Sequence, residues 1–145
     1  MTEEDWPQAT ELTALPVLDA PDRLFQVTRV SRTHTQVWLQ SDRSRAHPYR
    51  LEVLFQWVQY LCTPVVLRGL SLRRATADER ARISRQHDLV PDPRWDIYRL
   101  SRDSDAFIVS ARPLWAESDL RFDDAPVYWT RPDNDGVVKA MGTIA

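Results

Sequence analysis

The sequence predicts one domain of the α+β class, mostly antiparallel β, with six to eight short strands in a single sheet or a partly closed sheet. Segments rich in β-branched and aromatic residues alternate with short polar turns along most of the 145-residue chain. Only one or two short stretches carry helix signals. Strands do not alternate regularly with long helices, as a parallel α/β sheet would require. We therefore expect a single domain over residues 1–145 with one or two short helices.

The first 22 residues are expected to form an arm ahead of the sheet. They contain three prolines, and Pro7 suits the first turn of a helix, so a short helix over Gln8–Leu15 would end at Pro16. Two segments rich in β-forming residues follow, and the polar turn SRTH between them predicts a hairpin. These two strands are Leu24–Val30 and Thr35–Gln40.

The segment RLEVLFQWVQYL, Arg50–Leu61, predicts the central strand of the sheet. Apolar side chains recur along it with a period of two. The odd-numbered positions from Leu51 to Trp57 are all apolar, and we expect them to be buried together. Glu52 and Gln56 are expected on the other, less covered face.

A further strand and a helix are predicted after Pro64. The run VVLRGLSLRRA has β-forming composition, and Gly69 inside it indicates a bend or a bulge. The segment TADERARISRQH, residues 76–87, predicts a short surface helix. Thr76 and Glu79 have the spacing of a capping box, in which each side chain bonds the backbone amide of the other residue.

A second hairpin and a tail are predicted beyond the helix. The polar sequence SRDSD separates two β-rich segments, 94–100 and 106–115. The sequence VYW at 127–129 is expected to be another short strand. Residues 130–145 are expected to form a tail, in which VVKAM could add an edge strand.

Composition restricts the class of protein. The net charge is −2 and the pI is about 5.9. The single cysteine, Cys62, cannot form an internal disulfide, and the acidic start MTEEDWPQ is unlike a secretory signal. Three glycines exclude a glycine-rich phosphate loop, and the three histidines lack metal-ligand spacing. Because no apolar run approaches the ~18 residues of a spanning helix, we expect no membrane span. The single cysteine and the acidic start favour a cytoplasmic protein, and no cofactor or metal is expected.

Charge is distributed unevenly along the chain. Residues 41–85 carry nine arginines and four acids, whereas residues 1–40 and 86–145 sum to −3 and −4. Such segments either face one another in the fold or mark a binding surface. The basic segment could hold single-stranded nucleic acid, but a pI near 5.9 argues against a dedicated binder. Its arginines are Arg68, Arg73, Arg74, Arg80, Arg82 and Arg85.

An acidic loop is the second charged feature. Four carboxylates fall within eight positions, and oxygen clusters of this kind suit hard cations. The spacing lacks the alternating acids and central glycine of a calcium loop, so solvated charge or pairing with arginines is favoured. The four residues are Glu117, Asp119, Asp123 and Asp124.

Six tryptophans complete the candidate surfaces. If Val37 and Leu39 face the core, alternation leaves Trp38 exposed on the opposite face. Tryptophan and arginine are enriched at interface hot spots, although tryptophans also fill sheet-packed cores and can surround a second small core. The residues expected to bind a partner are Trp38, Arg73, Arg74, Arg82, Trp115, Glu117, Asp119, Asp123 and Asp124.

The sequence favours a small, non-enzymatic protein-binding domain, such as a bacterial toxin-neutralising immunity protein or an adaptor. No catalytic residue is predicted, and a protein partner is expected. One alternative is an enzyme or ligand-binding domain with an acidic-loop pocket. A second is weak single-stranded nucleic-acid binding through Arg68–Arg85. Pairing of edge strands also leaves a homo-oligomer open.

Overall fold

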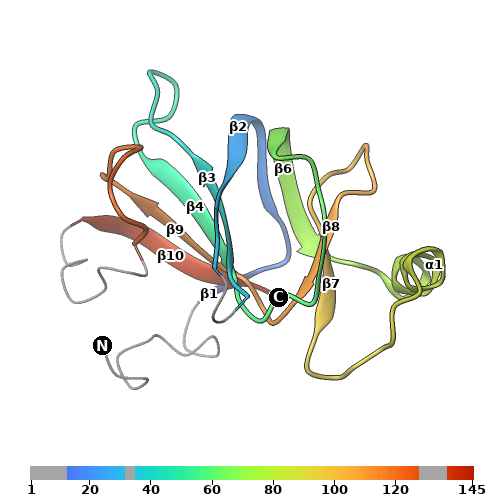
Figure 1. Cartoon of the computed structure of the whole chain (residues 1–145). Coiled ribbons are helices and arrows are strands. Elements are labelled where there is room, and N and C mark those ends of the chain that lie inside the picture. The colour runs from blue at the N-terminus through green and yellow to red at the C-terminus, as the bar shows by residue number, and fades with distance from the viewer. Residues whose placement is uncertain (1–12, 32–34, 128–136) are drawn as a thin grey trace, which may run out of the picture.

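The computed structural model describes residues 13–31, 35–127 and 137–145, and it shows one mixed sheet with one short helix in those ranges (Figure 1). The mostly-β class and the single sheet are confirmed, but ten strands are present instead of six to eight. The elements are β1 (Thr13–Leu15), β2 (Leu18–Val30), β3 (Val37–Ser41), β4 (Arg50–Phe55), β5 (Tyr60–Cys62), β6 (Val66–Arg74), α1 (Ala77–His87), β7 (Asp96–Arg99), β8 (Phe107–Ser110), β9 (Leu114–Ser118) and β10 (Val138–Ile144).

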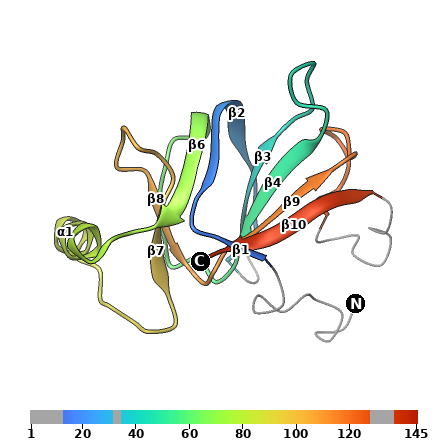
Figure 2. The ribbon, with the colours of Figure 1, turned by 180° about the vertical axis from the view of Figure 1, so that it is seen from behind.

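The sheet has the strand order β1-β10-β9-β4-β3-β2-β6-β7-β8-β5 and is not closed. Every neighbouring pair is antiparallel except β1 and β10, which run parallel, so the sheet is mixed. Figures 1 and 2 show β2 between two halves of the sheet, with β3, β4, β9 and β10 on one side and β6, β7 and β8 on the other. The two predicted hairpins, β2–β3 and β7–β8, are confirmed as antiparallel pairs.

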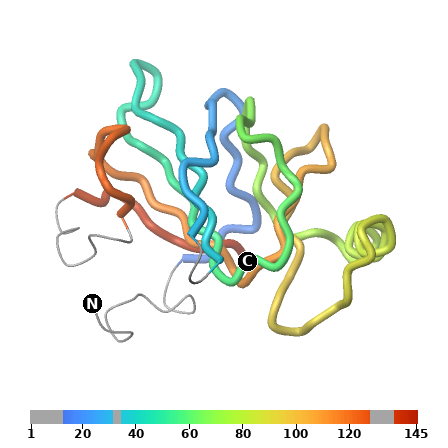
Figure 3. The backbone as a smooth tube through the Cα atoms, in the orientation of Figure 1, coloured from blue at the N-terminus to red at the C-terminus, as the bar shows by residue number. Residues whose placement is uncertain are grey.

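The predicted central strand is broken at its midpoint. β4 ends at Phe55, and Trp57 has a positive φ of 54°, so the alternation does not continue to Leu61. The chain turns here from one half of the sheet into the other, as the trace in Figure 3 shows. Trp57 is therefore 52% exposed instead of buried, whereas the odd-numbered positions up to Phe55 are buried as expected.

A bulge lies where Gly69 was expected to mark one, but its extra residues are in β2, where residues 21–23 lie opposite Gly69. The φ of Gly69 is +90°, and a Cβ at this position would lie 2.7 Å from the carbonyl oxygen of Pro21. The register between β2 and β6 shifts at the same place, between Ala20 and Leu24. A bulge increases the local bend of a strand. The 13-residue β2 pairs with β6 on one edge, mainly through its first part, and with β3 on the other edge through its last residues.

The core is divided among three clusters of buried side chains. The largest receives residues from strands of both sheet halves, including Phe25, Phe55, Leu72 and Ile108. A second cluster covers the opposite face of β3, β4 and β9, and a third lies beneath α1. The second contains Trp38, Leu54, Leu114, Ala116 and Val127, and the third contains Ala75, Ile83, Ile97 and Phe107.

Two tryptophans expected at a binding surface belong to these clusters. Trp38 is only 2% exposed because Val127 and its neighbours cover the face of β3 that the sequence left open. Trp115 is 9% exposed and packs in the largest cluster, where its Nε1 donates to the carbonyl oxygen of Thr143. The expected exposure of Trp38 was therefore wrong, and both indoles are buried within the fold.

Both ends of the described part of the chain form strands in the sheet. Residues 13–22, expected to be part of an arm, lie mostly in β1 and β2, and the remaining arm residues, 1–12, lie outside the described ranges. Within the tail, β10 is present as a strand between β1 and β9. Only the first residue of the expected strand at 127–129 is described. No helix among the described residues is long and apolar enough to cross a membrane.

Candidate functional site

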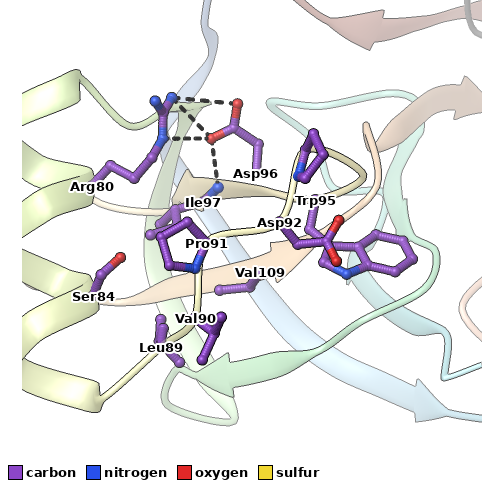
Figure 4. Close-up of a pocket in the computed structure, with 11 residues that line it drawn as sticks. Arg80, Ser84, Leu89, Val90, Pro91, Asp92, Trp95, Asp96, Ile97 and Val109 are labelled. Atoms are coloured by element: carbon purple, nitrogen blue, oxygen red, sulfur yellow. Dashed lines mark hydrogen bonds and ion pairs between the residues drawn. The ribbon is translucent and has the colours of Figure 1, made fainter.

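A surface pocket of about 360 Å³ lies between α1, β7, β8 and the segment that joins α1 to β7 (Figure 4). Ile97 and Val109 form its floor, since they face each other across β7 and β8. Arg80 and Ser84, one helical turn apart, line it from α1. The opposite wall is residues 89–95. The volume lies at the lower end of the range for ligand pockets, roughly 300–1,000 Å³.

The start of α1 is held by the predicted capping box. Thr76 Oγ1 accepts from the amide of Glu79, and a Glu79 carboxylate oxygen accepts from the amide of Thr76. Arg73 donates two hydrogen bonds to the same carboxylate, at 2.6 and 2.9 Å, and Arg99 of β7 donates a third. These donors hold the pKa of Glu79 well below its usual range, with the bonds from Arg73 as the largest cause. The helix is thereby fixed to β6 and β7 at its first turn.

The far end of α1 and its buried face fix the helix against the sheet. Asp88 adopts the left-handed conformation, with φ 54°, and its amide donates to the carbonyl oxygen of Ser84. The amide of Leu89 donates to the same oxygen at 2.9 Å. Ile83 is fully buried in the cluster with Ile97 and Phe107. These contacts leave Arg80 and Ser84 facing the pocket.

The wall opposite α1 is stiffened by its composition and by local bonds. Pro91 and Pro93 each fix one φ angle. Asp92 accepts from both the side chain and the backbone amide of Arg94, at 2.8 Å each, and this pairing lowers the pKa of Asp92 to about 2. The guanidinium of Arg94 lies 5.0 Å from the centre of the Trp95 ring. The two prolines and these local bonds restrict the backbone of the wall.

The polar rim of the pocket is built around Asp96. Its carboxylate accepts from Arg80 at 3.1 Å and from the amide of Ile97 (Figure 4). It also pairs at 3.2 Å with Arg74, which does not itself line the pocket. The Asp96 side chain is 19% exposed, whereas those of Arg74 and Arg80 are 40% and 43% exposed. The carboxylate is thus turned inward and the two guanidinium groups face solvent.

Apolar surface continues beyond the pocket. Val90, at its lip, is 89% exposed. On the other side, Tyr60 of β5 is the antiparallel neighbour of Val109, so the two side chains share one face of the sheet. The Tyr60 ring stacks on Phe107 and its hydroxyl lies 3.0 Å from Nδ1 of His87, at the end of α1. Exposed apolar groups therefore flank the pocket on two sides.

Of the three predicted arginines, one contacts the rim of the pocket and two form ion pairs elsewhere. Arg74 pairs with Asp96 at the rim, although it does not line the pocket itself. Arg73 binds Glu79, and Arg82 pairs with Asp105 at 3.2 Å, outside the pocket lining. All three are ion-paired within the chain, which was the alternative that the sequence left open for this segment. Their partners are not the acidic loop.

The predicted acidic residues do not converge on one point. Asp119 pairs with Lys139 at 2.9 Å, and Asp124 accepts from the amide of Arg121 at 2.7 Å. Glu117 is half-buried in β9, and Asp123 is exposed. Among the described residues, no three histidine, cysteine, aspartate or glutamate side chains gather as a metal site.

The acidic loop is fastened by a buried ion pair that the sequence did not reveal. Arg50 and Glu52 lie 2.7 Å apart and are 0% and 1% exposed. Arg50 donates to the carbonyl oxygens of Arg121 (2.7 Å), Asp124 (3.1 Å) and Ala125 (3.0 Å). Glu52 accepts from the amide of Val127 at 2.6 Å. Burial raises the pKa of Glu52, and the charge of Arg50 opposes that rise. The pair therefore holds the segment that covers Trp38.

Comparison with known proteins gives no family. The chain matches no protein-family model, no curated protein and no solved structure. The function is therefore inferred from the geometry of the site. The pocket residues were missed because the segment DLVPDPRW has the composition of an ordinary loop. Its two prolines and its tryptophan directly after a capped helix were the available signal.

Proposed function

We propose that this chain is a non-enzymatic protein-binding domain that docks its partner at the pocket beside α1. The observation that carries the proposal is the pocket itself, which is mainly apolar and has stiff walls. Val90 at the lip of the pocket is almost fully exposed. Trp95 and Arg80 line the pocket, and Arg74 pairs with Asp96 at its rim. Aromatic residues and arginine dominate the energetics of protein interfaces when they surround a desolvated centre. The proposed surface is formed by Arg74, Arg80, Val90, Trp95 and Val109.

The acids of the pocket favour binding over catalysis. Asp92 is paired with Arg94, and Asp96 is paired with Arg74 and Arg80. A general acid–base residue needs a pKa near the working pH, whereas pairing with Arg94 moves the pKa of Asp92 further from it. The acidic-loop alternative has less support because its four carboxylates do not converge on one point. The nucleic-acid alternative has less support because Arg73 and Arg82 form ion pairs away from the pocket and the pI is about 5.9.

A toxin-neutralising immunity protein or an adaptor in the bacterial cytoplasm is the specific form that we propose for this domain. Such proteins act by covering part of a partner, so a preformed docking pocket is sufficient for their function. An electrostatically biased rim would also speed their encounter with that partner. The nearest candidates for the partner are proteins encoded beside this gene.

The test is capture of those neighbouring proteins by the purified chain, with two matched variants. Ser84→Trp fills the pocket from α1, whereas Gln86→Trp places the same side chain on α1 outside the pocket lining. We expect a neighbour to bind the wild-type chain and Gln86→Trp with equal affinity, and Ser84→Trp at least tenfold more weakly by titration calorimetry. Failure of every neighbour to bind, or equal binding to Ser84→Trp, would overturn the proposal.

A further inference from the structure

We propose that the partner of the α1 pocket is an acidic protein segment, which inserts one large apolar side chain and sets a nearby carboxylate against Arg74 and Arg80. This inference rests on the proposed function and adds the chemistry of the ligand. The apolar side chain of the partner contacts the floor and wall of the pocket, and its carboxylate contacts the rim.

The apolar part follows from the lining. Ile97 and Val109 form the floor, and Leu89, Pro91 and Trp95 line the wall (Figure 4). A volume of about 360 Å³ can hold one large side chain together with adjoining backbone. Because two prolines and the Asp92 bonds restrict the wall, less of its conformational entropy is lost on binding.

The acidic part follows from which charges face outward. In all three ion pairs around the pocket the carboxylate is the more buried partner and the guanidinium is the more exposed one. Asp96 is 19% exposed, against 40% for Arg74 and 43% for Arg80. Asp92 is 27% exposed, against 72% for Arg94. An approaching segment therefore meets positive groups first, which favours a carboxylate and disfavours a lysine or arginine.

The donor count at Asp96 supports the same conclusion. Two guanidinium groups carry about ten N–H donors, whereas one carboxylate offers about four lone-pair sites. Asp96 also accepts from the amide of Ile97, so part of its capacity is already used. Arg74 and Arg80 together therefore retain donors that a second carboxylate can satisfy. The two arginines also carry one positive charge more than Asp96 balances.

The experiment selects peptides from a random 12-residue phage library on the immobilised full chain. We expect enriched sequences to contain one large apolar residue with Asp or Glu within a few positions of it. A synthetic peptide from the selection should bind Ser84→Trp at least tenfold more weakly than Gln86→Trp by fluorescence polarisation. Replacing its acid with the matching amide should weaken binding to the wild-type chain about tenfold.

Two arginine variants assign the acid to the rim. Arg80→Gln should make the acidic and amide peptides bind with similar affinity. Arg82→Gln is the matched control, because it changes the same residue type on α1 and also removes an ion pair, but neither Arg82 nor its partner Asp105 lines the pocket. Arg74→Gln gives an independent measurement if Arg80→Gln fails to fold, as judged by thermal unfolding. Both rim variants should also reduce the salt dependence of binding.

The outcomes separate this inference from the proposed function. Peptides that require the open pocket but bind equally with acid or amide would overturn the acidic partner and leave the docking pocket intact. Peptides that bind Ser84→Trp as well as the wild-type chain would overturn both. Enrichment of basic peptides, or of none, would overturn the inference while the capture of a folded neighbour still tests the docking function.

Discussion

Arg50 and Glu52 show how single residues hold distant parts of this chain together. Both sit on β4 and point to the face opposite the largest core, where the segment 121–127 covers them. The guanidinium of Arg50 donates to three carbonyl oxygens of that segment, and the carboxylate of Glu52 accepts from one of its amides. Removing one member would leave a buried charge and several buried backbone groups unpaired, which is more costly than losing the pair itself.

We predict that Arg50→Met destabilises the protein by about 3–5 kcal/mol, because Glu52 remains buried without its partner. The double variant Arg50→Met/Glu52→Leu should lose less than the sum of the two single variants, since it removes both charges. Urea unfolding at pH 7 measures all three. A loss below about 1 kcal/mol for Arg50→Met would contradict the role given to this pair.

Trp38 and Glu52 mark the limit of prediction at the residue scale. The alternation along each strand assigned both side chains correctly to the face opposite the core. It could not show that this face is covered as well, because the cover comes from residues 75 positions further along the chain. Local periodicity reports which side chains share a face, and long-range packing decides whether that face meets water.

At the scale of elements, the first turn of α1 joins three parts of the fold. Glu79 belongs to the helix, Arg73 to β6 and Arg99 to β7, and all three meet at one carboxylate. The capping box was readable from the sequence because both of its members lie within four residues. The two arginines were not, since nothing local indicates that β6 and β7 would bring them to the helix terminus.

We predict that Glu79→Gln lowers stability by about 2 kcal/mol at pH 7, because glutamine keeps the cap but loses the charge. Since the pKa of Glu79 is lowered in the folded state, the unfolded chain takes up the proton first as the pH falls. The stabilisation is therefore present above about pH 5 and is lost towards pH 2. Glu79→Gln should show a shallower decline over this range than the control Asp78→Asn, by urea unfolding at several pH values. Parallel profiles would contradict the assignment.

The pocket illustrates the same limit for an element that has no regular structure. The helix on one side and the strands beneath were predicted, and so the scaffold was available from the sequence. The wall 89–95 depends on two prolines, on the Asp92–Arg94 bonds and on the left-handed Asp88. Such features define a loop conformation only in combination, so that composition alone predicted a loop and not a binding wall.

For the whole molecule, β10 connects the two ends of the described chain. It pairs with β9 on one side and with β1 on the other, and the amide of Ala145 donates to the carbonyl oxygen of Leu15. Its residues also enter the core, with Ile144 fully buried. The sequence predicted a possible edge strand here. It could not predict the parallel partner, which lies more than 120 residues away and makes the sheet mixed.

We predict that deleting residues 138–145 prevents cooperative folding, because β9 and β1 lose a neighbour and the largest core cluster loses Ile144. Circular dichroism and thermal unfolding provide the measurement. The control is Ala145→Gly, which keeps the backbone amide that bonds Leu15. A deleted chain that unfolds cooperatively at the wild-type temperature would show that β10 is dispensable.

The ion pair between Lys139 and Asp119 gives the chain a built-in reporter. Lys139 is the one lysine in the sequence, and it sits on β10 against the start of the segment that Arg50 holds. Amine-reactive reagents therefore modify a single side chain, apart from any free terminal amine. The ammonium pairs with Asp119 but is about a third exposed, so it can be acylated in the folded protein. One covalent label can thus be placed beside Asp119, at the start of the segment that Arg50 holds.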